Sequence, residues 1–211
     1  MYNWLYYYGN GYDAQQWTRQ QRSQNVDIIA SYFHDKGWTI NALASMIGNM
    51  EGESYINPGQ WQHSFPVESP SPSCGYGLVQ WTPWWQKIGP WTDNNLTDYD
   101  KQLTRINWEL ENEDALGPDS QWQKRHGYTE SFYDFSRSTN DTDYLTSCFF
   151  WCYENGTAST IPIRQQNSRY WYQYLIDNPP GPIPPGPTPP SRKSNAMNIG
   201  LYLKPYWKRG Y

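Results

Sequence analysis

The first part of the chain has a helical pattern of apolar positions. An apolar residue returns every three or four positions over about residues 25–36, and Gly37 directly follows this range. This spacing predicts an amphipathic helix that ends at the glycine. A second helical pattern begins after Thr39, a residue type that caps helix N-termini. Its apolar stripe is made of Ile40, Leu43, Ala44, Ile47 and Met50.

Loops and further helices follow. Residues 57–75 are rich in Pro, Gly and Ser and predict a loop. The apolar residues 78–81, which follow Gly75 and Gly77, predict a short strand, and 114–130 are irregular. These segments predict a mainly α domain, of α+β type, in which a small β/loop lobe interrupts the helices. The remaining helical patterns span about residues 98–113, 141–154 and 162–175.

Composition divides the chain into four parts. Residues 1–24 are aromatic and then rich in Gln and Arg, which indicates an arm that packs on the body or on a partner, or a short element folded back on the domain. Residues 25–177 form the domain. Residues 178–191 contain eight prolines and predict an extended, semi-rigid linker. Residues 192–211 are basic and aromatic and are either a docking peptide or a disordered tail.

Aromatic content is high and overall charge is low. Aromatic residues make up 18% of the chain, with 13 Trp and 19 Tyr, so flat rings either offer stacking surfaces or fill the core. A net charge of −4 argues against a broad nucleic-acid surface. The sequence has no signal-peptide pattern and no apolar run of about 20 residues that would span a membrane. Cys74, Cys148 and Cys152 lack zinc-site spacing, so we expect buried thiols and no metal.

Two carboxylates end the second helical pattern. No Lys or Arg occurs between Lys36 and Lys87, so neither Glu51 nor Glu53 has a basic neighbour in sequence. A Glu buried against an apolar helix end keeps its proton, as a general acid must. The alternative is a solvated helix end with two surface acids. On a regular helix Glu53 falls at the edge of the apolar stripe and Glu51 near its centre, but Gly52 makes a regular helix doubtful there.

Two motifs resemble those of a known superfamily. Residues 53–58, Glu-Ser-Tyr-Ile-Asn-Pro, match the Glu-Ser-x-apolar-Asn-Pro pattern of lysozymes and lytic transglycosylases. Residues 75–81, which begin 17 positions later, resemble the Gly-x-Gly-Leu-Met-Gln segment that faces the Glu in the same superfamily. The chain also resembles the tail lysozymes of bacteriophages at residues 37–61, at 77–83 and in parts of 102–164. The similarity therefore covers roughly residues 25–176.

The resemblance implies a lysozyme-like domain with a glycan cleft beside the β/loop lobe, and no cofactor. Glu53 would be the catalytic acid that protonates a glycosidic oxygen of peptidoglycan, with Glu51 as the alternative acid. Gln80 would hydrogen-bond in the cleft. The other substrate-binding residues that we expect are Trp81, Tyr76, Trp61, Ser54 and Asn57.

A second carboxylate is not marked by any motif. Glu68, Asp93 and Asp98 are the candidates, and hydrolysis and lytic transglycosylation both stay open. The histidines His34, His63 and His126 have no accompanying Ser or Cys motif, so an amidase or peptidase lacks support.

The resemblance also implies a place of action. We expect a muramidase carried in a phage tail that opens the cell wall during genome entry, attached to other tail proteins through residues 1–24 and 192–211. The alternative is a non-catalytic glycan-binding or structural tail protein on a lysozyme-like scaffold, since fold alone does not fix function. The intact Glu53 favours the enzyme.

Overall fold

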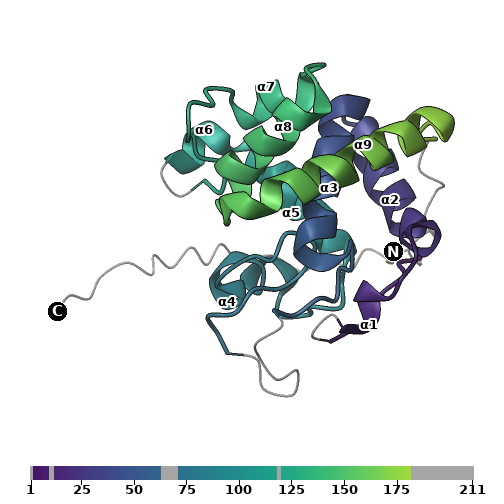
Figure 1. Ribbon diagram of the computed structural model, residues 1–211. Coiled ribbons are helices and arrows are strands. Elements are labelled where there is room, and N and C mark those ends of the chain that lie inside the picture. Colours follow the sequence, from purple (N-terminus) through teal and green to yellow (C-terminus); the bar gives the residue numbers. More distant parts are fainter. Residues whose placement is uncertain (1, 10–11, 63–70, 118–119, 182–211) are drawn as a thin grey trace, which may run out of the picture.

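The computed structural model describes residues 2–9, 12–62, 71–117 and 120–181, which fold mostly into helices around one central helix, α3 (Ile40–Ser54). Figure 1 shows α3 in the middle of the molecule, with α8 (Thr142–Phe149) and α9 (Ile161–Asp177) across it. The predicted mainly α class is therefore confirmed. The other helical elements are α1 (Tyr12–Gln15), α2 (Arg19–His34), α4 (Trp84–Lys87), η1 (Pro90–Thr92), α5 (Asp100–Glu111), α6 (Glu113–Leu116), α7 (Phe132–Arg137), the π-helical η3 (Phe150–Glu154) and η4 (Ala158–Thr160).

Helix α3 is the helix that the apolar pattern predicts. The Thr39 side chain accepts a hydrogen bond from the Ala42 N–H at 3.2 Å, so the predicted N-cap is confirmed. Helix α9 packs directly on the α3 backbone, because a Cβ on Gly48 would lie 2.0 Å from the Ser168 Oγ. The small residue is what allows the two helices to approach this closely.

Helix α2 begins at Arg19, six positions before the predicted start at residue 25, so that prediction was wrong. A capping box causes the earlier start. The Gln21 N–H donates to the Thr18 Oγ1 at 3.2 Å, and the Thr18 N–H donates to the Gln21 Oε1 at 2.9 Å. Part of the segment that composition assigned to an arm is therefore the first turns of a body helix.

The described residues 2–9 lie against the domain. The Trp4 indole N–H donates to Asp100 on α5 at 2.9 Å, and the Leu5 N–H donates to Asn25 on α2 at 2.8 Å. Gly9 forms a single parallel β-bridge with Gln60. The N-terminal segment is thus hydrogen-bonded to two helices and a loop.

The predicted strand at residues 78–81 is wrong, because residues 77–80 form a turn. Gly77 has φ +85° and Gln80 has φ +50°, and an extended strand accommodates neither. Within the described ranges, bridges outside helices are the isolated pairs Gly9–Gln60, Trp61–Tyr76 and Tyr76–Trp81. Figure 1 shows α4 and these loops on one side of the helical part.

Several predictions lie outside the described residues, namely those for the loop at 63–70, most of the linker and the whole of 192–211. The thiols of Cys74, Cys148 and Cys152 are buried and free. No helix in the part of the chain described here combines the length and apolar character needed to cross a membrane.

Candidate active site

The C-terminal end of α3 carries Glu53 into the loop region. The helix stays regular through Gly52 and ends at Ser54, after which Tyr55 and Ile56 adopt φ values of 57° and 59°. A left-handed conformation is unusual for β-branched Ile56, and strained backbone of this kind gathers at functional sites. The Ser54 hydroxyl donates to the Leu78 carbonyl at 2.9 Å, which ties the helix end to the turn at 77–80.

A cavity of about 500 Å³ opens between the end of α3, that turn and the end of η3. Its volume is in the range of small-molecule and cofactor sites. Glu53 and Gln80 both line it, so the structure brings together the two residues that the motifs place on opposite sides of a cleft. The other lining residues are Gln62, Val79, Thr82, Gln121, Glu154 and Gly156.

Arg164 of α9 bridges two carboxylates at this cavity. Its Nη2 lies 2.5 Å from the Glu53 Oε1, and its Nη1 lies 2.6 Å from the Glu154 Oε2. The Glu53 side chain is 21% exposed, whereas those of Arg164 and Glu154 are 6% and 3% exposed. Arg164 is held from the other side by the Asn49 carbonyl, to which Nη1 donates at 3.0 Å. Glu53 is therefore the most exposed member of this cluster, and Glu154 lines the same cavity while almost fully buried.

Gly52 makes room for the cluster. A Cβ at this position would come within 3.0 Å of the Arg164 Cζ and 3.1 Å of its Nη1. The glycine that made the helix doubtful in sequence thus fits a regular helix, and the absence of a side chain lets the guanidinium pass between α3 and α9.

Glu154 is placed by the π-helical turn η3, a type of irregularity that is common at functional sites. Tyr153 in the same turn anchors it, because the Tyr153 hydroxyl donates to the buried Glu109 carboxylate on α5. Burial raises the pKa of the Glu154 carboxyl well above its ordinary value. Arg164 opposes this increase, and the neighbouring Glu53 carboxyl adds to it.

Glu51 lies apart from the cavity. Its side chain is 5% exposed and forms ion pairs with Arg22 and, at 3.4 Å, with Arg19. Its other carboxylate oxygen accepts a hydrogen bond from the Trp171 indole N–H at 2.8 Å. Glu51 therefore links α2, α3 and α9, and it is not among the residues that line the cavity.

Most of the other predicted substrate-binding residues have no free surface. Trp61 and Trp81 are 1% exposed and Tyr76 is 0% exposed, so their rings fill the core and the prediction of sugar stacking is wrong for this structure. Ser54 and Asn57 are also fully buried. Asn57 accepts from the Tyr7 N–H and donates to the Tyr7 carbonyl, which fixes the N-terminal segment.

The predicted candidates for a second carboxylate are not in the cavity. Asp93 and Asp98 do not line it, and Glu68 lies outside the described residues, as does His63. Glu154 is the carboxylate that sequence reasoning did not single out. Tyr153, Glu154 and Arg164 lie in the stretch that resembles the family, but the resemblance assigns them no role.

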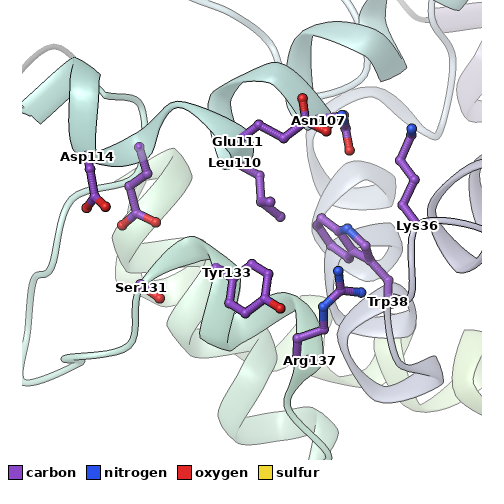
Figure 2. Close-up of a pocket in the computed structure, with 10 residues that line it drawn as sticks. Lys36, Trp38, Asn107, Leu110, Glu111, Asp114, Ser131, Tyr133 and Arg137 are labelled. Atoms are coloured by element: carbon purple, nitrogen blue, oxygen red, sulfur yellow. Dashed lines mark hydrogen bonds between the residues drawn. The ribbon is translucent and has the colours of Figure 1, made fainter.

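A second cavity, of about 470 Å³, lies between α5, α6, α7 and the connection from α2 to α3. Figure 2 shows Trp38, Leu110 and Tyr133 around this space, with Asp114 at one end and Lys36 at the other. None of the predicted site residues lines it.

Comparison with known proteins places the chain in a family. Residues 24–175 match the family model described as phage tail lysozyme. The chain belongs to the phage tail lysozyme family. The matched range contains Glu53, Gln80, Glu154 and Arg164, and it leaves out the N-terminal segment and everything after residue 175.

The chain is also 35% identical over 161 residues to Morphogenesis protein 1 of Bacillus phage B103. The aligned part covers 75% of the chain but only 41% of that relative. The chain thus spans less than half the length of this relative.

Proposed function

We propose that this protein cleaves the glycan backbone of bacterial peptidoglycan, as a lysozyme (N-acetylmuramidase) or a lytic transglycosylase, with Glu53 as the general acid. The observation that carries the proposal is the position of Glu53, partly exposed at the end of α3, in one cavity with Gln80. Membership of the phage tail lysozyme family supports the same reaction class.

In this mechanism Glu53 gives a proton to the glycosidic oxygen as the bond to the anomeric carbon breaks. Gln80 is the proposed hydrogen-bonding residue of the cleft. Its side-chain N–H groups donate to the Gln60 and Gly77 carbonyls at 3.1 and 3.0 Å. This fixes the side chain at the cavity wall. Val79 and Gln80 of the turn at 77–80 line the same cavity as Glu53.

The alternative is a non-catalytic glycan-binding or structural tail protein. The phage B103 relative is named for morphogenesis and not for catalysis, which is the observation that favours this alternative. A cavity lined by an accessible carboxyl group favours the enzyme, since a binding protein has no need of an acid there.

Clearing of purified cell walls, followed as loss of turbidity, separates the two functions. We expect wild type to clear the walls and Glu53→Gln to lose clearing while it stays folded. Glu51→Gln is the matched control, because it makes the same change two positions away, outside the cavity. Equal clearing by wild type and Glu53→Gln would remove Glu53 from the mechanism. No clearing by wild type would favour the binding protein.

We further propose that the protein is a virion component that acts during genome entry. Residues 1–24 and 192–211 are its proposed contacts with other tail proteins. Deletion of residues 192–211 is expected to leave wall clearing in solution intact and to reduce incorporation into particles. Normal incorporation of the shortened protein would refute the docking role.

A further inference from the structure

Charge balance at the cavity points to a shared proton. Two carboxyl groups, Glu53 and Glu154, share one guanidinium, that of Arg164. If both carboxyl groups were ionised, the cluster would carry one uncompensated negative charge although two of its three members are almost fully buried. One proton on the carboxyl pair makes the cluster neutral, and burial favours the neutral state.

One carboxyl oxygen of the pair lacks a hydrogen bond, which indicates where the proton lies. The Glu154 Oε1 is buried and has no hydrogen-bond donor. The Glu53 carboxyl, which pairs with the same Arg164 guanidinium, raises the pKa of Glu154, after burial and against Arg164. A proton between the two carboxyl groups would make the missing hydrogen bond, since a protonated carboxyl is a donor.

The charged groups that act on Glu154 come from two elements. Helix α3 contributes Glu53 and α9 contributes Arg164, and these are the charged groups that shift the pKa of Glu154. The remaining residues that line the cavity are uncharged. The Lys87 ammonium of α4 is bonded to the Gln121 side chain at 3.1 Å.

We propose that Glu154 is a positioning residue that shares one proton with Glu53, with Arg164 as the counter-ion for the charge that remains. This inference rests on the proposed function. The proton moves from the Glu154 Oε1 to Glu53, and Glu53 then delivers it to the glycosidic oxygen as the C–O bond breaks. The hydroxyl that next attacks the anomeric carbon, from water or from the sugar itself, gives up one proton to the carboxyl pair and restores it.

The pH dependence of wall clearing tests this. In Glu154→Gln the amide brings no shareable proton, and Arg164 alone balances the Glu53 carboxylate. The alkaline limb of the activity profile is therefore expected to move down by about one pH unit or more. Near neutral pH this is a loss of about tenfold, with recovery towards the wild-type rate in acid. Glu154→Asp keeps a shareable proton and is expected to restore much of the shift.

The control variants separate a positioning role of Glu154 from an effect on the stability of the fold. Glu51→Gln removes another buried carboxylate of the same region and is expected to leave the limb in place. An unmoved limb in a folded Glu154→Gln protein overturns the proposal even if wild type clears walls and Glu53→Gln does not. If wild type does not clear walls, the proposed function fails first.

Carbon NMR of the glutamate carboxyl groups tests the shared proton without any activity and without the Glu154 variant. In wild type one carboxyl of the pair is expected to stay protonated well above the ordinary range, and Glu53→Gln is expected to lower that titration, because Arg164 then faces a single carboxylate. Two carboxyl groups that titrate normally and independently in wild type would overturn the proposal.

Discussion

Replacement of Glu51 by Gln is expected to cost stability and to spare catalysis. The Glu51 side chain is 5% exposed and that of its partner Arg22 is 10% exposed, so the change leaves a buried guanidinium without its anion. Breaking a buried ion pair from one side costs about 3–5 kcal/mol. We expect the lower end, about 3 kcal/mol, because Gln still offers one neutral acceptor and the second pair, to Arg19, is partly exposed and contributes little.

Thermal unfolding followed by circular dichroism measures this loss. A chain of this size loses about 2–4 °C in melting temperature for each kcal/mol, so Glu51→Gln is expected to melt about 6–12 °C below wild type. Wall clearing per folded molecule, measured well below that temperature, is expected to be unchanged. Glu53→Gln is expected to show the opposite result, with wall clearing lost. Its melting temperature is expected to change little, because Arg164 keeps its ion pair with Glu154.

Two results would refute this reasoning. An unchanged melting temperature of Glu51→Gln would mean that the ion pairs with Arg22 and Arg19 do not stabilise the fold. Loss of clearing at an unchanged melting temperature would make Glu51 the acid, which is the alternative that the sequence left open.

Further predictions concern packing and pH. Gly48→Ala is expected to lower the free energy of unfolding in urea by about 1–3 kcal/mol, because the added Cβ meets Ser168. This is the net loss, after the roughly 1 kcal/mol that Ala gains over Gly in a helix. Tyr153→Phe is expected to cost about 2 kcal/mol in the same assay, since it removes a donor from the buried Glu109. The raised pKa of Glu154 means that its contribution to stability is present below the ordinary value of 4.5 and is lost as pH rises through its folded pKa. A pH series of melting temperatures should therefore fall more steeply with rising pH for wild type than for Glu154→Gln.

The main features of the helical domain could be predicted because apolar spacing and capping residues are local. The α3 stripe, its Thr39 cap and the approximate positions of α5, α8 and α9 all follow from such signals. The start of α2 was missed because its capping box lies in a stretch of Gln and Arg without an apolar pattern. Local polar contacts, and not burial, determine that end of the helix.

The Glu53–Gln80 pairing could also be predicted, because each residue lies in a short motif. The role of the aromatic residues could not. The loop region between α3 and α5 has no extended sheet among the described residues, so large rings provide its core. The rings of Trp61 and Tyr76 pack with centroids 4.4 Å apart. A sequence does not distinguish a ring that is buried under a cleft from one that lines it.

Glu154 could not be assigned from sequence for a different reason. Its approach to Glu53 depends on a π-helical turn and on the space left by Gly52 for Arg164. The space at Gly52 is used by a residue more than 100 positions away in the chain, as the Glu53–Arg164 pair shows, and Tyr153 of the turn is bonded to Glu109, 44 positions away. The neighbouring residues of Glu154 in sequence contain no sign of this contact.

The most direct test of the account is mass spectrometry of the products released from purified peptidoglycan by wild type and by equally folded Glu53→Gln. Wild type is expected to release fragments cut within the glycan strand, with either a reducing or an anhydro end, and Glu53→Gln is expected to release none above background. Glycan fragments released equally by both proteins, or by neither, would contradict it.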